Sequence, residues 1–97
     1  MAEAKSATVT DQIDINSIQP VKPADPRVVE IGQFVVEKFH HGKLLFIAVL
    51  GGFTWKCEGG KYYALVIENQ NYEGATFIHK ALVVEAPGET KLLWHKN

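Results

Sequence analysis

Residues 25–39 of the chain read DPRVVEIGQFVVEKF, and this stretch predicts a helix. Asp25 can accept hydrogen bonds from the free backbone N–H groups at a helix start. Pro26 suits the first helical position, where its missing N–H has no partner. Apolar side chains then recur at steps of three or four residues, which is the spacing of one helical face: Val28, Ile31, Val35 and Phe39. We expect a helix from Pro26 to His41 whose apolar face contacts a sheet.

The rest of this helix is divided between a wider apolar face and a solvated one. Phe34 and Val36 extend the apolar face on either side. We expect the polar residues on the opposite side to face water: Glu30, Gln33 and Glu37. Because several of its residues are β-branched and form helices only moderately well, packing must hold this helix more than propensity does.

The sequence after the helix predicts an antiparallel sheet. Four stretches are rich in apolar, aromatic or β-branched residues: Leu44–Leu50, Lys61–Glu68, Thr76–Glu85 and Lys91–His95. They are separated by turn-forming residues: Gly51-Gly52, Gly59-Gly60, Asn69 to Gly74 and Pro87-Gly88. Before the helix, Ile13 to Val21 alternates loosely and is interrupted by prolines, which indicates a short edge strand. The fold class is α+β, with one N-terminal helix packed on a four- to five-stranded antiparallel sheet.

Composition limits the kinds of protein this can be. A chain of 97 residues predicts one domain over residues 13–97, preceded by a flexible arm over residues 1–12. Ten basic and eleven acidic residues give a formal net charge of −1, which argues against nucleic acid and acidic membranes as partners. The longest apolar run, Leu44–Leu50, is far shorter than the ~20 residues of a membrane span. The start carries no targeting signal, so we expect a cytoplasmic protein, or a secreted one whose signal peptide has been removed.

No pattern of catalytic or metal-binding residues stands out. Cys57, the only cysteine, cannot form an internal disulfide and lacks a local nucleophile signature. The four histidines that could activate it or bind a metal are scattered along the chain: His40, His41, His79 and His95. No phosphate-binding glycine motif is present. We therefore predict that the protein is not an enzyme and uses no metal and no cofactor.

Two large aromatic residues, Phe53 and Trp55, lie in a glycine-flanked segment between predicted strands. Aromatic side chains near a hairpin end either fold back onto the sheet or remain exposed for a partner. The sequence leaves both alternatives open.

The helix stretch resembles that of plant cystatins. Their helix carries roughly Leu-Ala-Arg-Phe-Ala-Val, and Ile31-Gly32-Gln33-Phe34-Val35-Val36 occupies this stretch in order. The resemblance extends over residues ~16 to 97 through further matching segments: Pro20-Val21, Tyr63 to Ile67, Ala81 to Glu85, Pro87, and Lys91 to Leu93. It implies a helix gripped by a four- or five-stranded antiparallel sheet, and a reversible inhibitor that occludes the active-site cleft of papain-like cysteine proteases.

Cystatins insert three segments into that cleft, and this chain departs from the family at each of them. Asn16 and Ser17 replace an N-terminal Gly-Gly. The first hairpin, Gln-x-Val-x-Gly in the family, corresponds here to residues of which only Gly59 matches: Trp55, Lys56, Cys57, Glu58 and Gly59. The second hairpin keeps Pro87, but Gly88 replaces the family's Trp. These nine positions form the predicted protease-binding site.

The altered residues leave two main functions open, and an enzyme or small-ligand binder on a similar scaffold is a third alternative, because fold alone does not fix function. One is a cysteine-protease inhibitor, weak or retuned. The other is a non-inhibitory, cystatin-like interaction module that binds another protein through Phe53, Trp55 and their neighbours. We expect a monomer or a dimer that exchanges hairpins.

Overall fold

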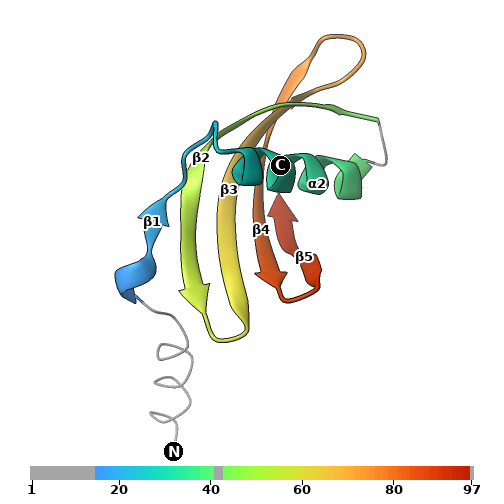
Figure 1. Cartoon of the computed structure of the whole chain (residues 1–97). Coiled ribbons are helices and arrows are strands. Elements are labelled where there is room, and N and C mark those ends of the chain that lie inside the picture. The colour runs from blue at the N-terminus through green and yellow to red at the C-terminus, as the bar shows by residue number, and fades with distance from the viewer. Residues whose placement is uncertain (1–14, 41–42, 97) are drawn as a thin grey trace, which may run out of the picture.

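The computed structural model describes residues 15–40 and 43–96, with only the backbone of Ile15, Phe39 and His40 (Figure 1). The predicted arm over residues 1–12, the helix end at His41 and the packing of Phe39 therefore lie outside the described residues. None of the described helices has the length and apolar character needed to cross a membrane.

One helix packs on one face of a five-stranded antiparallel sheet, which confirms the α+β prediction (Figure 1). A 3-10 turn, η1 (Ile15–Ser17), leads into the short strand β1 (Gln19–Pro20) and then the helix α2 (Pro26–His40). The remaining strands follow in order: β2 (Leu45–Cys57), β3 (Gly60–Gln70), β4 (Thr76–Ala86) and β5 (Glu89–Lys96). Each strand pairs with its neighbour in sequence, so β1 and β5 form the two edges of the sheet.

The helix begins where its sequence predicts. The Asp25 side chain accepts a hydrogen bond of 2.8 Å from the Arg27 N–H, and its carbonyl accepts one of 2.9 Å from Val29. Both contacts satisfy backbone groups that a helix N-terminus otherwise leaves free. The three described residues of the predicted apolar face are buried, namely Val28, Ile31 and Val35. Glu30, Gln33 and Glu37 are exposed, as predicted.

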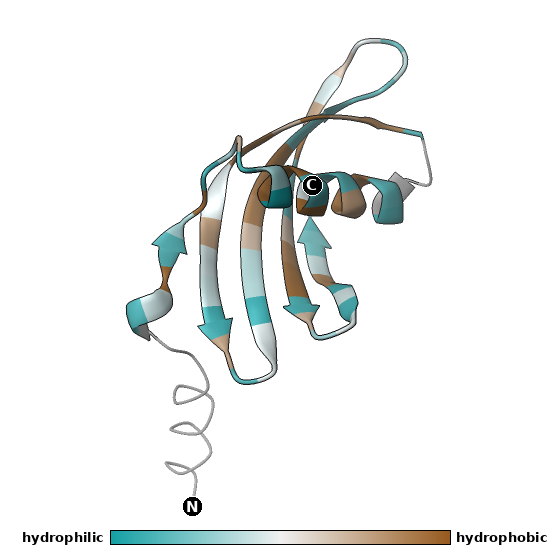
Figure 2. Ribbon diagram, viewed as in Figure 1, coloured by the Kyte–Doolittle hydropathy of each residue, from teal (hydrophilic) through white to brown (hydrophobic). Residues whose placement is uncertain are grey.

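The core lies between α2 and one face of the sheet. Side chains along β3 alternate between the two faces, and Tyr63, Leu65 and Ile67 point toward the helix and are almost fully buried. On β4, Ala81 and Val83 complete this layer. Figure 2 shows that hydrophobic residues form continuous runs in the central strands β3 and β4, so both faces of the sheet carry apolar side chains there.

The prediction that Gly51-Gly52 forms a turn is wrong, because both residues lie inside the long strand β2. The strand continues to Cys57 and carries irregularities between Phe46 and Ala48 and between Val49 and Gly51. Gly52 has a φ of 144°, and a Cβ there would lie 2.0 Å from the Ala64 carbonyl oxygen. Gly52 therefore lets β2 pass close to β3 without ending the strand.

We expect Ile31→Ala to lower the free energy of unfolding by ~2–5 kcal/mol, because a side chain that is 1% exposed leaves a cavity when truncated. Gln33→Ala, on the exposed side of the same helix, should change it by less than ~0.5 kcal/mol. Denaturant unfolding of both variants checks this. Equal stabilities would contradict the packing of α2.

Candidate functional site

The two turns that join β2 to β3 and β4 to β5 lie side by side at one end of the sheet (Figure 1). Cys57 pairs with Gly60 around the turn Glu58-Gly59, and Ala86 pairs with Glu89 around the turn Pro87-Gly88. A Cβ on Gly60 would lie 2.7 Å from the carbonyl oxygen of Glu85, so the two hairpins are in close contact just behind their turns.

The N-terminal segment reaches the same end of the sheet. The Ser17 hydroxyl accepts a hydrogen bond of 2.8 Å from the backbone N–H of Lys56. Beyond it, β1 pairs with β2 through Gln19 opposite Thr54 and Pro20 opposite Phe53. The structure thus brings the three predicted segments together, and we name η1 with the turns Glu58-Gly59 and Pro87-Gly88 the turn edge.

A hollow of about 380 Å³ separates η1 from the first hairpin. It is lined from η1 by Asn16 and Ser17 and from the hairpin by Trp55 and Lys56, with Lys61 also contributing. The N-terminal segment is therefore attached to β2 by hydrogen bonds, yet leaves a recess beside the turn.

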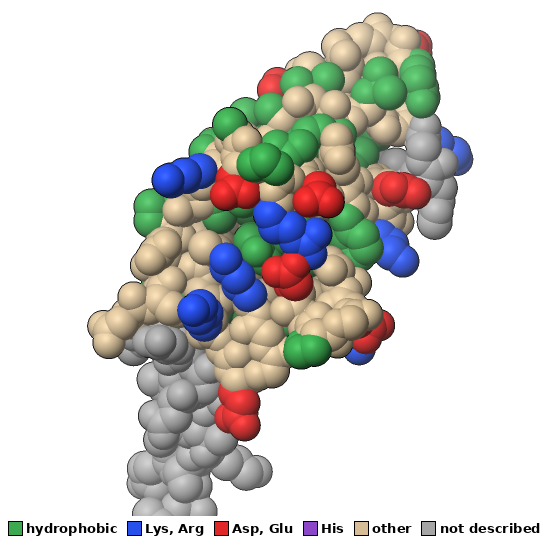
Figure 3. Space-filling model, in the orientation of Figure 1, with side chains coloured by type: hydrophobic (Ala, Val, Ile, Leu, Met, Phe, Trp, Pro, Cys, Tyr) green, Lys and Arg blue, Asp and Glu red, His purple; other side chains and the backbone are tan. Residues whose placement is uncertain are grey.

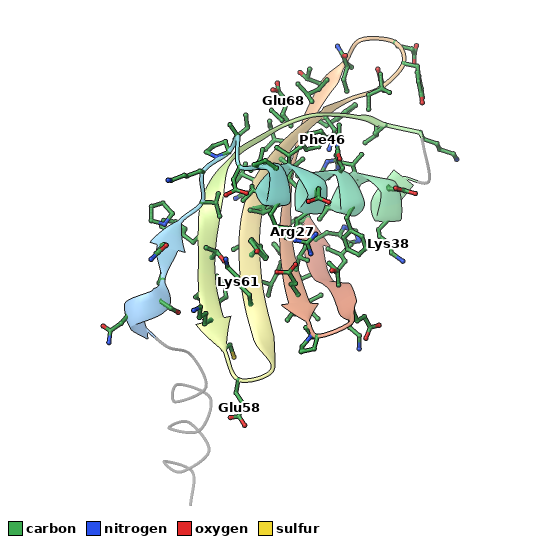
Figure 4. The ribbon with its side chains drawn as sticks, viewed as in Figure 1. Arg27, Lys38, Phe46, Glu58, Lys61 and Glu68 are labelled. Atoms are coloured by element: carbon green, nitrogen blue, oxygen red, sulfur yellow. The ribbon has the colours of Figure 1, made fainter. Side chains whose placement is uncertain are left out.

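The tip of the first hairpin is polar. Glu58 is exposed and points away from the protein (Figure 4). Gly59 has a φ of 95°, a conformation that L side chains rarely adopt, so this glycine is required by the turn itself. Lys56 is also exposed. A partner that covers this tip would have to compensate the charges of Lys56 and Glu58.

Trp55 does not project from the tip. Its ring stacks on that of Tyr62 with centroids 5.7 Å apart and an interplanar angle of 5°, and it is half-buried. Phe53 lies further along β2 and is 53% exposed. Their placement in a loop-like segment between strands was wrong, because both belong to β2. Of the two open alternatives, Trp55 lies back on the sheet and Phe53 faces solvent.

The second turn has the sequence and conformation of a type II turn. Such a turn places Pro at its second position and a residue with φ near +80° at its third. Gly88 has a φ of 79°. A tryptophan at this position would carry backbone strain of about 1–2 kcal/mol, so the glycine shapes the turn rather than merely replacing a larger residue.

An ionic cluster connects the turn edge to the helix, and the sequence analysis did not find it. Arg27, at the start of α2, forms an ion pair with Glu85 on β4 and lies 3.9 Å from Glu30. Tyr63 donates a hydrogen bond of 3.3 Å to Glu85, and the Lys61 ammonium lies 5.4 Å from the Tyr63 ring centroid. Figure 3 shows the basic and acidic side chains gathered on this side of the protein, and Figure 4 places Arg27 and Lys61 there.

The histidines with described side chains lie far from Cys57. His79 is 2% exposed, and its Nδ1 lies 2.6 Å from the Asn69 amide nitrogen. His79 pairs with Ile67 and Cys57 with Gly60, so seven residues of β3, about 23 Å, separate the two levels of the sheet. His95, opposite Ala81 on the far edge strand, is also remote. The side chains of His40 and His41 lie outside the described residues.

Within residues 15–40 and 43–96, no three His, Cys, Asp or Glu side chains are grouped so that they could hold a metal ion.

Comparisons with protein-family models, with curated proteins and with solved structures each found no match.

Burial raises the pKa of Tyr63, and the negative charge of Glu85 and the hydrogen bond donated to it raise this pKa further. We expect a tyrosine that ionises above the ordinary value of ~10 in an absorbance titration. Because the pKa of Tyr63 is higher in the folded than in the unfolded chain, its neutral hydroxyl contributes its full stabilisation at any pH below the pKa of the unfolded chain. This stabilisation should then be lost as pH rises through the folded value.

Tyr63→Phe should remove the component that ionises at high pH from that titration. Glu85→Gln should lower the pKa of Tyr63, because it removes the nearby negative charge. Unchanged titration curves in both variants would contradict the cluster.

Cys57 is partly exposed beside the turn. We expect a thiol reagent to label it in the native protein, at a rate within a few-fold of that in denaturant. Complete protection of the native thiol would contradict the placement of this hairpin, and the Cys57→Ser variant controls for unspecific labelling.

Proposed function

We propose that the protein is a cystatin-like, reversible inhibitor of papain-like cysteine proteases that occludes the active-site cleft with the turn edge. The observation that carries this proposal is the meeting of three segments, distant in sequence, at one end of the sheet. The arrangement of one helix on a five-stranded antiparallel sheet supports it, since this is the architecture that the resemblance implies.

The turn edge is suited to enter a narrow cleft because its backbone is fixed before binding. Each hairpin turn contains only two residues between paired strand positions. The Ser17–Lys56 hydrogen bond and the Arg27–Glu85 ion pair tie the edge to its neighbours. An interface that is ordered in the free protein loses little conformational entropy on binding.

The same edge predicts weaker binding than a typical family member would show. Its tip presents Glu58 and Lys56, whose desolvation costs free energy unless the protease supplies partners. At the second turn, Pro87 provides an exposed apolar contact, but Gly88 supplies no aromatic anchor. An anchor of that kind contributes ~2 kcal/mol or more to an interface. We therefore propose a weak or retuned inhibitor.

A papain inhibition assay tests the proposal. We expect competitive inhibition by the unmodified protein, with a constant in the micromolar range. Pro87→Asp should weaken it about tenfold, because a charge then enters a desolvated contact. Trp55→Gln combined with Cys57→Val should tighten it about tenfold, because the first hairpin then regains residues of the family motif.

Glu37→Ala, on the exposed side of α2, is the matched control and should leave inhibition unchanged. Inhibition that no edge variant alters would contradict the assignment of the site. Gly88→Trp should tighten papain inhibition by less than an aromatic anchor normally does, because the tryptophan would adopt a strained φ of 79°.

A second candidate is a non-inhibitory interaction module, which the exposure of Phe53 favours. The absence of measurable papain inhibition at high micromolar concentration would support this candidate over the first. In either case we propose a non-enzymatic protein whose partner is a papain-like protease or another protein, located in the cytoplasm or secreted.

A further inference from the structure

The sheet face that points away from α2, here called the outer face, is apolar where water is expected. Antiparallel sheets with one covered face normally carry polar residues on the other. Here the central positions of β3 and β4 that face outward are Ala64, Val66 and Leu82. The residues before and after each of them in the sequence face the helix. Flanking them, Phe53 on β2 is 53% exposed and Trp94 on β5 is 50% exposed.

The apolar positions of the outer face border a hollow of about 670 Å³ that is largely open to solvent. Small residues border it, namely Gly51, Gly52, Ala64 and Ala81, and the side chain of Ala81 faces the helix side. Larger residues also line it: Leu50 and Phe53 from β2, Val66 from β3, Leu82 from β4 and Trp94 from β5. A volume of this size is typical of sites for small organic ligands, which are mostly apolar with few polar groups.

The register explains why the hollow forms. Phe53 pairs with Ala64, Ala64 with Leu82 and Leu82 with Trp94, so one row crosses the sheet from β2 to β5. Within this row a methyl group lies between large side chains. Since neighbouring strands lie ~4.8 Å apart, the row is about 14 Å long from β2 to β5.

The polar residue that lines the hollow is a cation. Lys80 borders it, and Lys96 lies directly opposite Lys80 on β5, so both side chains are on the outer face. In the part of the chain that the structure describes, neither lysine forms an ion pair, whereas Lys91 on the same strand pairs with Glu89 at 3.6 Å. Like charges opposite each other on a sheet are unfavourable unless an anion compensates them.

We propose that the outer face binds a small hydrophobic anion, namely an unbranched carboxylate with a hydrocarbon tail. The tail lies along the row from Trp94 to Phe53, over Ala64. The carboxylate lies between the ammonium groups of Lys80 and Lys96. Burial of the tail supplies the affinity, and the two charges set its direction.

A second copy of the chain fits this face less well. A two-fold interface places the same patch on both subunits, so the hollow of one copy would meet the hollow of the other. The two hollows would then remain unfilled behind Phe53 and Trp94. A thin, flexible chain fills such a hollow, whereas another sheet does not.

Titration calorimetry with laurate below its micelle concentration tests the proposal. We expect saturable binding of one laurate per chain, tighter than that of dodecanol and much tighter than that of dodecylamine. Equal affinities for laurate and dodecylamine would overturn the role of the lysines, and the absence of laurate binding would overturn the site.

Variants locate the ligand. Gly51 has no positive φ, and a Cβ there would meet open space, so Gly51→Leu should place a side chain in the hollow without disturbing the fold. Unfolding measurements verify that it is folded, and its laurate affinity should fall at least tenfold. The double variant Lys80→Gln and Lys96→Gln should bind laurate about tenfold more weakly, whereas its affinity for dodecanol should change little.

Lys38→Gln, on the helix that covers the other face, is the matched charge control and should bind laurate normally. Laurate binding that Gly51→Leu does not weaken would overturn the placement on the outer face. Dimerisation of the unmodified chain that Gly51→Leu abolishes and laurate does not reverse would assign this face to a second copy instead.

Discussion

The structure depends on the close approach of α2 to β2 at Gly32. A Cβ at this position would lie 2.7 Å from the Phe46 ring and 2.8 Å from a Val49 methyl group. Only glycine therefore allows this separation between helix and strand without rearrangement. The sheet gains its core by wrapping this one helix, and β2 must bend to follow it. The strand is irregular between Phe46 and Ala48 and between Val49 and Gly51, and at Gly52 the φ of 144° and the nearby Ala64 carbonyl again require glycine.

This wrapping determines what each end and each face of the sheet can do. Below the helix, the strands continue as two hairpins whose short turns meet beside the N-terminal segment. The Arg27–Glu85 ion pair and the Tyr63 hydrogen bond join this end to the start of the helix. Among the elements that the structure describes, only α2 covers a face of the sheet, so the apolar row on the other face has no covering element there. The proposed protease contact therefore lies at one end of the sheet, and the proposed ligand site lies on its outer face.

The buried Asn69–His79 pair shows how polar groups are accommodated in a small core. Asn69 and His79 are both almost fully buried and contact each other across β3 and β4. The side-chain oxygen Oδ1 of Asn69 has no hydrogen-bond partner in the described structure. An unpaired buried oxygen costs free energy, so the pair contributes less to stability than apolar residues of the same shape would. The stability of the core therefore comes chiefly from the apolar contacts of Ile31, Val35, Leu65 and Ile67.

The sequence by itself determined the elements whose signals are local. The Asp25-Pro26 start and the three-to-four spacing of Val28, Ile31 and Val35 were sufficient for α2, because capping and helical periodicity involve only near neighbours. The Pro87-Gly88 turn was likewise predictable from its residue types. Only the tertiary structure decided that Gly51-Gly52 lies within a strand and does not end it, because a glycine pair is compatible with either. It also decided that Asn69 continues β3, that Trp55 lies against Tyr62, and that Arg27 meets Glu85, since these contacts depend on strand register, which joins residues far apart in the chain.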